Sequence, residues 1–164
     1  MQISAASAIW FLPFVLPICF FVIFNDLREM RITNKTVLVL VGVFVVIGLV
    51  ALPFDQYLWR FAQLGIVLLI GIVLNAAGTM GGGDAKFLAA AAPFVESGDL
   101  ILLGQIFAAC LLAAVATQRI AKYSGLRRLA PHWINWDRGR LFPMGMALGG
   151  TLAMYLGLGA VFGV

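Results

Sequence analysis

The sequence predicts an all-α membrane protein with about six transmembrane helices. Of its 164 residues, 63% are hydrophobic and 11% are charged, and the mean hydropathy is +1.04. A soluble domain is about half apolar and about a quarter charged, so this composition is typical of a chain embedded in lipid. Backbone polar groups in hydrocarbon must be satisfied within their own segment, and a helix needs about 20 apolar residues to cross it.

Uncharged apolar runs mark the expected helices in order. They cover 8–24, 36–53, 61–77, 87–95, 100–118 and 141–164. The fourth run is too short to span alone, so we expect it to borrow from the glycines before it or to be sheltered by neighbouring helices. The first run has no Lys or Arg before Arg28, so it lacks the basic region of a cleavable signal peptide and is interpreted as a span. We expect a single membrane domain over 1–164.

The basic residues indicate an orientation, because Lys and Arg concentrate in the cytoplasmic loops of membrane proteins. Apart from Arg60, they follow the first run, follow the third or precede the last: Arg28, Arg31, Lys35, Lys86, Arg119, Lys122, Arg127, Arg128, Arg138 and Arg140. We therefore expect both termini on the extracytoplasmic side and a cytoplasmic basic loop over 119–140. Trp133 and Trp136 within that loop favour contact with an anionic leaflet. The net charge of +4 reflects this bias rather than nucleic-acid binding.

Few side chains in this sequence are able to support catalysis. Cys19 and Cys110 lie in separate apolar runs and form no C-x-x-C pair, so neither a disulfide framework nor a zinc site is expected. His132 is the single histidine, which argues against a histidine-rich metal site and against a Ser-His-Asp triad. We expect no metal and no cofactor, and any chemistry falls to carboxylates.

The predicted topology sorts the seven acidic residues by membrane side. Asp26, Glu29, Asp84 and Asp137 fall on the cytoplasmic side, and Asp55, Glu96 and Asp99 fall in short turns on the other. We expect the second group to be solvated loop acids without a role.

Asp26 and Asp84 are the candidate catalytic residues. Asp26 follows the apolar stretch ending at Phe24, at the cytoplasmic end of the first helix, where an ion pair with Arg28 or Arg31 is the alternative interpretation. Asp84 follows three glycines and opens the fourth run, where a helix N-cap is the alternative. The glycines leave the backbone open to an extended peptide.

If the two carboxyl groups meet, they form an aspartic-protease dyad. Mutual repulsion makes one group hold a proton near neutral pH while the other stays ionised. The ionised group takes a proton from water, and the protonated group polarises the scissile carbonyl. Both candidates fall on one membrane side at helix ends, as this mechanism requires.

Three stretches resemble motifs of the type IV prepilin peptidases, which are membrane aspartic proteases of the GxGD group. Residues 26–34, DLREMRITN, resemble D-x-[RK]-x(3)-I-P-N around the family's first catalytic aspartate, with Thr33 in place of proline. Residues 81–86, GGGDAK, match G-x-G-D-x-K, which holds the second. Residues 142–145, FPMG, resemble the start of the family's last helix, with Met144 in place of an aromatic residue.

The resemblance implies a membrane peptidase of the bacterial inner membrane. It would remove the short basic leader of a prepilin at the cytoplasmic face, with Asp26 and Asp84 catalytic and the following residues supporting catalysis or binding substrate: Gly81, Gly82, Gly83, Lys86, Arg28 and Asn34. Positive-inside anchoring is the alternative for Arg28 and Lys86, and helix capping for Asn34. The chain is most similar to the short members associated with Flp pili, the TadV and CpaA proteins. Longer members carry paired C-x-x-C motifs and methylate the new pilin N-terminus, so we expect cleavage without methylation here.

Two other functions remain open from the sequence. A small proton- or ion-coupled transporter is the first, because ionisable residues near a bilayer often mark ion pathways. A non-catalytic scaffold of a pilus or secretion system is the second. The spacing of Gly145 and Gly149 favours close helix packing, which we expect within the chain.

Overall fold

The computed structural model describes residues 1–123 and 143–164, and these ranges are almost entirely helical. Helices α1 (Ala5–Glu29), α2 (Asn34–Ala51), α3 (Phe54–Ala76), α5 (Leu100–Tyr123) and α6 (Met144–Phe162) are long and apolar enough to cross a membrane. Helix α4 (Gly82–Ala91) is short and leads into the 3-10 turns η1 (Ala92–Phe94) and η2 (Ser97–Asp99). The predicted all-α polytopic fold is confirmed. The predicted basic loop, 119–140, lies outside the described residues from position 124, with His132 and Asp137.

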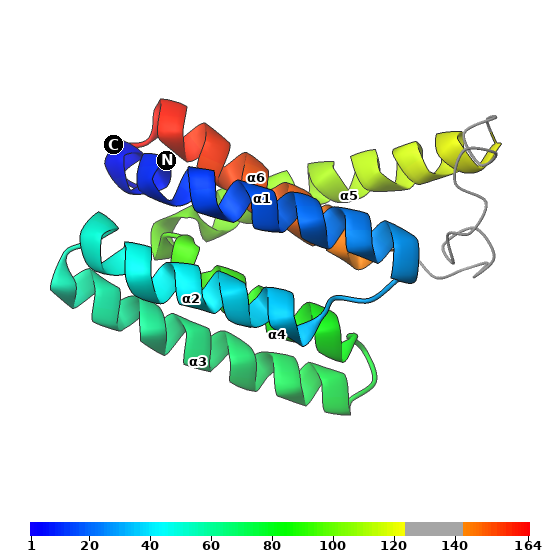
Figure 1. The fold of residues 1–164 in the computed structure, drawn as a ribbon, viewed down its shortest axis with the longest axis horizontal. Coiled ribbons are helices and arrows are strands. Elements are labelled where there is room, and N and C mark those ends of the chain that lie inside the picture. Colours follow the sequence, from blue (N-terminus) through cyan, green and yellow to red (C-terminus); the bar gives the residue numbers. More distant parts are fainter. Residues whose placement is uncertain (124–142) are drawn as a thin grey trace.

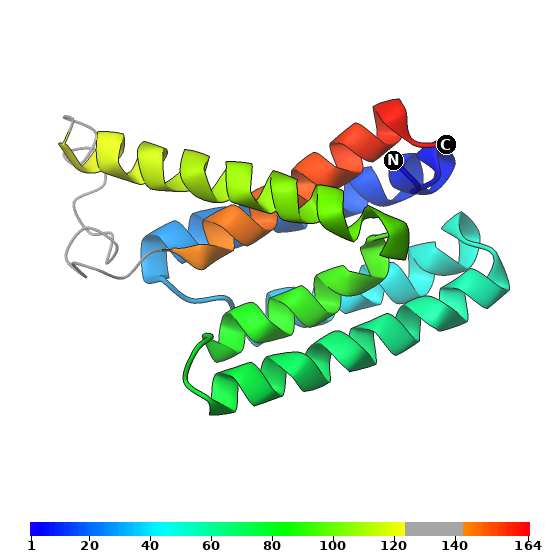
Figure 2. The same ribbon diagram turned by 180° about the vertical axis from the view of Figure 1, so that it is seen from behind.

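The helices form a bundle with two distinct ends (Figure 1). The α1–α2 turn, the α3–α4 loop and the start of α6 lie at one end, which we call the aspartate end because Asp26 and Asp84 are there. The chain termini lie side by side at the other, the far end, where the Ala5 N–H donates to the Val164 carbonyl. Seen from behind, α5 packs along α6 (Figure 2). Which end faces the cytoplasm stays a prediction from the basic residues.

The short fourth helix is sheltered as the sequence predicts. Helix α4 begins within the glycine segment, at Gly82, and packs against α2, α3 and α6. Its alanines are mostly buried, and a Cβ at Gly71 of α3 would lie 3.0 Å from the Ala85 Cβ. Small residues on both helices let their backbones approach closely. The half-length helix therefore meets protein rather than lipid.

Aromatic packing holds the far end of α4 in place. The ring of Phe94 in η1 lies 5.0 Å from that of Phe11 in α1 and 5.6 Å from that of Phe44 in α2, edge to face in both pairs. All three side chains are fully buried.

Helix α6 packs closely on α1 through a glycine. At Gly149 of α6, a Cβ would lie 3.1 Å from the Cys19 carbonyl oxygen of α1. The glycine spacing in the last helix thus serves packing within the chain.

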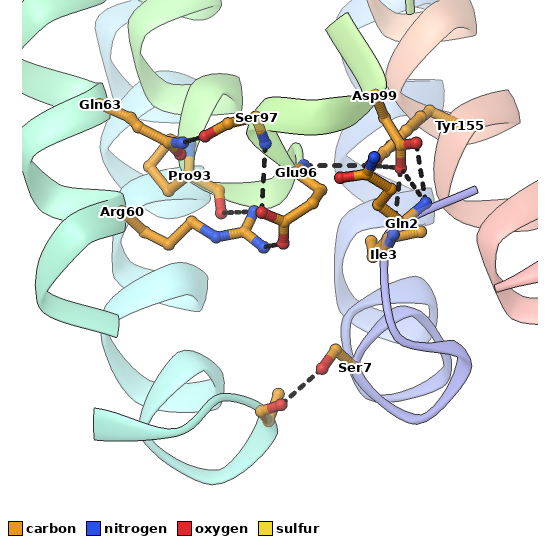
Figure 3. A network of polar contacts seen from close by, with 11 residues as sticks. Gln2, Ile3, Ser7, Arg60, Gln63, Pro93, Glu96, Ser97, Asp99 and Tyr155 are labelled. Atoms are coloured by element: carbon orange, nitrogen blue, oxygen red, sulfur yellow. Dashed lines mark hydrogen bonds and ion pairs between the residues drawn. The ribbon is translucent and has the colours of Figure 1, made fainter. Parts of the chain in front are cut away.

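The expectation that the outer acids are solvated is wrong for two of the three. Asp55 is exposed, but Asp99 is 4% exposed and Glu96 forms an ion pair with the buried Arg60. The reason lies in the short α4, because its connection to α5 is buried over residues 93–95 before it returns to the surface at Ser97 and Gly98. Buried polar groups there need internal partners, and Figure 3 shows the network that supplies them.

Candidate active site

Asp26 lies in the last turn of α1 and faces α6. Helix α1 ends where Met30 adopts a left-handed conformation (φ 51°). The Met30 N–H donates a 2.8 Å hydrogen bond to the Asp26 carbonyl oxygen. The Asp26 side chain is 4% exposed, and its Oδ2 accepts a hydrogen bond of 2.7 Å from the Gly145 N–H. The Met146 N–H bonds the same carboxyl. The first turn of α6 therefore fixes the orientation of this group.

The alternative of an ion pair for Asp26 is wrong within the described chain. Arg28 instead lies 3.9 Å from Glu29, with both side chains largely exposed. Asp26 is thus held by uncharged backbone donors and not by a boundary arginine.

Glycine is required where α6 meets Asp26. A Cβ at Gly145 would lie 2.9 Å from the Cβ, Cγ and Oδ2 atoms of Asp26, closer than ordinary van der Waals contact. Gly145 is the last residue of the third motif. Its spacing to Gly149 predicts close packing, but its contact with a catalytic candidate was not predicted.

Asp84 lies in the first turn of α4. The N-cap of this helix is Gly81 (φ −64°, ψ 138°), so the interpretation of Asp84 as the cap is wrong. The side chain is half-buried, and burial raises the pKa of Asp84 above its ordinary value. A Cβ at Gly81 would lie 2.8 Å from the Asp84 Oδ2, so the carboxyl group occupies the space that this glycine leaves open.

The first two motifs touch each other at the aspartate end. A Cβ at Gly83 would lie 3.4 Å from the Ile32 Cβ and 3.5 Å from its carbonyl oxygen, so the α1–α2 turn packs on the glycine segment. The Lys86 Nζ donates a 3.0 Å hydrogen bond to the Asn34 Oδ1. Residues 52 positions apart in the chain thus tie the start of α4 to the start of α2.

The capping interpretation of Asn34 is wrong. Helix α2 is capped by Thr33, whose hydroxyl oxygen accepts from the Thr36 N–H at 3.4 Å, and Asn34 is its first residue. Threonine replaces the motif's proline and starts the helix by a different means, because a side-chain oxygen satisfies one of the free N–H groups. The Asn34 amide is then available to Lys86.

A cavity of about 360 Å³ opens between these elements. It is lined by residues of both motifs and by the start of α6: Asp26, Met30, Arg31, Ile32, Asn34, Gly81, Gly82, Gly83, Asp84, Lys86 and Met144. Asp26 and Asp84 are close enough for their charges to interact. The structure therefore brings every predicted site residue except Arg28 to one cavity.

A comparison with models of protein families identifies the family of this chain. Residues 13–117 match the model described as the type IV leader peptidase family. The chain belongs to the type IV leader peptidase family. Neither the curated proteins nor the solved structures that were searched gave a match. Membership implies a peptidase, and with the five long apolar helices it describes a multi-pass membrane protein.

The range that matches the family contains Asp26 and Asp84 but ends within α5. The contribution of α6 therefore comes from the structure, which adds Met144 as a lining residue and Gly145 as a donor to Asp26. The sequence also left Met30 and Ile32 without a role. The FPMG stretch was the signal that pointed to α6, and the left-handed Met30 has no comparable signature.

The cavity holds the parts that acid–base catalysis needs. Two carboxyl groups line it, and one can act as acid and the other as base when a proton is bound to only one of them. Cationic groups are present at the rim, where Arg31 and Lys86 line the same cavity. In the described ranges, no group of three or more His, Cys, Asp or Glu side chains is placed to hold a metal ion.

Proposed function

We propose that this chain is an aspartic endopeptidase that removes the short basic leader from Flp-type prepilins at the cytoplasmic face of the bacterial inner membrane. The observation that carries the proposal is that Asp26 and Asp84, 58 positions apart in sequence, line one cavity at one end of a membrane bundle. Family membership supplies the reaction class, and the carboxyl pair supplies the means.

The chemistry needs only the two carboxyl groups and a water molecule. The ionised carboxylate takes a proton from the water as its oxygen bonds to the scissile carbonyl carbon, and the protonated partner gives its proton to the carbonyl oxygen. A tetrahedral diol forms. Its collapse breaks the C–N bond: the carboxyl group that took the proton from water gives it to the leaving amine, and the ionised partner takes a proton from a diol hydroxyl, so the pair returns to its single-proton state.

The position of the site suits a substrate anchored in the bilayer. Asp26 lies in the last turn of one span, and Asp84 in the first turn of a sheltered helix, so both stand near the level where helices leave hydrocarbon. A prepilin keeps its hydrophobic helix in the membrane and presents its leader junction at that level. The extended backbone of the junction can approach the glycine segment, where no side chains obstruct it.

Co-expression with an Flp-type prepilin tests the proposal directly. We expect Asp26→Asn and Asp84→Asn each to lower the leader-removal rate by about 10³-fold, since each removes one partner of the acid–base pair. Asp55→Asn is the matched control, because Asp55 is exposed at the start of α3 and outside the cavity. A gel shift follows the leader, and processing that survives either dyad substitution contradicts the proposal.

A second measurement tests the restriction to cleavage. The protein should release mature pilin whose N-terminal amine stays unmethylated when S-adenosylmethionine is supplied. Mass spectrometry of the product distinguishes the two forms, and a methylated product would refute this part of the proposal.

A further inference from the structure

A buried polar network joins three helices at the far end of the bundle (Figure 3). Arg60 of α3 is 3% exposed, and its guanidinium donates a 3.1 Å hydrogen bond to the Pro93 carbonyl and forms an ion pair with Glu96. The end of α4 and η1 is therefore attached to α3 by a rigid, forked donor.

The same connection is attached to α6 through one phenol. The Tyr155 hydroxyl oxygen accepts from the Glu96 N–H at 3.1 Å, and the hydroxyl donates to the Asp99 Oδ2 at 2.9 Å. Asp99 also accepts from the backbone N–H groups of Gln2 and Ile3, at 2.8 to 3.0 Å. Tyr155 is fully buried, so these bonds are made away from solvent.

Helices α4 and α6 both run from the carboxyl pair toward the network, which they reach at η1, after the end of α4, and near the middle of α6. Nine positions separate Asp84 from Pro93 along α4 and η1, and ten separate Gly145 from Tyr155 along α6. At a rise of about 1.5 Å per residue, both segments are about 14 to 15 Å long. If α6 moved along its axis relative to α4, the Tyr155 contact in the network and the Gly145 contact with Asp26 would therefore shift together.

Stability alone is a poor explanation for burying these charges. A buried ion pair is often no more stabilising than apolar packing of the same volume, because removing charges from water is costly. A directional hydrogen bond between two helices forms at only one position of one helix along the axis of the other, whereas apolar contacts tolerate several such positions. Side chains of a helix bundle in lipid otherwise permit small sliding motions.

We propose that Tyr155 is a positioning residue, which holds α6 at a fixed axial height relative to α4 and so holds the Gly145 N–H, the donor that orients Asp26 of α1, in place relative to Asp84. Its consequence for cleavage rests on the proposed function. Tyr155 does not touch the cavity and acts only through the two helices.

The matched pair Tyr155→Phe and Tyr57→Phe tests this inference. Tyr57 is also buried, and its hydroxyl donates to the Val45 carbonyl at 3.0 Å, but this bond joins α2 and α3. We expect Tyr155→Phe to lower kcat by about 10²-fold with little change in KM, since a displacement of about 1 Å costs about that much in a preorganised site. Tyr57→Phe should leave kcat unchanged, and equal kcat values for the two variants would overturn the proposal.

A distance measurement keeps the test independent of peptidase activity. Spin labels at Lys86→Cys and Met144→Cys, with Cys19 and Cys110 replaced by alanine, report the separation of α4 and α6 at the aspartate end. We expect Tyr155→Phe to shift or broaden this distance by about 1.5 Å, the rise of one residue, and Tyr57→Phe to leave it unchanged. An unchanged distance in Tyr155→Phe refutes the inference.

The two readouts separate the possible failures. If the wild-type chain cuts no prepilin but the label distance responds to Tyr155→Phe, the proposed function is wrong and the positioning role stands. If Tyr155→Phe does not accumulate in the membrane, Asp99→Ala removes the acceptor of the Tyr155 hydroxyl and is held to the same two outcomes.

Discussion

Gly145→Ala tests whether close packing of α6 on α1 positions the catalytic candidate. The added methyl group would lie 2.9 Å from three atoms of Asp26, at least about 0.5 Å inside ordinary contact. Rotation of the Asp26 side chain cannot relieve all three contacts, because its Cβ is fixed to the backbone of α1. The helices must separate instead, and the 2.7 Å bond from the Gly145 N–H must lengthen.

The expected magnitude follows from this displacement. A misplacement of about 1 Å costs about 10²-fold in rate, so a shift of about half that size predicts a loss of cleavage of about tenfold or more. Overpacking costs about 1 to 3 kcal/mol, and the better helix propensity of alanine offsets less than about 1 kcal/mol. We expect a modest loss of stability beside a clear loss of activity.

The assay is the initial rate of prepilin cleavage by purified protein, measured beside the thermal unfolding midpoint. Gly157→Ala is the control on the same helix, because a Cβ at that position meets no atom within 4 Å. It should keep full activity and gain stability by about 0.5 to 1 kcal/mol. If Gly145→Ala cleaves as fast as Gly157→Ala, the close approach of α6 does not orient Asp26.

Two further predictions concern the other carboxyl group. Burial raises the pKa of Asp84, so the folded protein favours its protonated form, and stability decreases as pH rises from the ordinary carboxyl value through the raised one. Asp84→Asn should therefore unfold at a higher temperature than the wild type at neutral pH, and a midpoint difference that persists unchanged in acid would contradict this. Gly81→Ala should slow cleavage with little change in stability, because the added Cβ comes too close to the Asp84 Oδ2, the end of a side chain that can rotate away. Gly65→Ala is the control, because a Cβ there has no atom within 4 Å. Equal cleavage rates for the two variants would refute the prediction.

Much of the fold was predictable because lipid imposes one simple rule on the sequence. Every span must satisfy its own backbone and avoid charge, so uncharged runs mark the helices. The short run 87–95 was predicted to need shelter, and the buried alanines of α4 show how that need is met. Helix starts were less predictable, since Thr33 caps α2 where Asn34 was the candidate.

The contacts that complete the site were harder to predict because they join distant residues. The hydrogen bond from Gly145 to Asp26 spans 119 positions, and nothing local in the FPMG stretch requires it. The buried Asp99 and Glu96 were misjudged for a related reason. Acids in a short connection are usually solvated, but here part of the connection after the short α4 is buried, which the local sequence does not reveal.

The placement of the acids favours the proposed peptidase over a transporter. A proton or ion relay needs ionisable groups at intermediate depth, whereas in the described chain the buried acids lie at helix ends: Asp26 in the last turn of α1, Asp84 in the first turn of α4, and Asp99 at the start of α5. Asp99 belongs to the far end and Asp26 to the aspartate end, and fully buried apolar side chains such as Phe87 and Phe94 belong to the core of the bundle. Two acids at separate ends of an apolar core favour the proposed reaction at one face of the membrane over a relay through it.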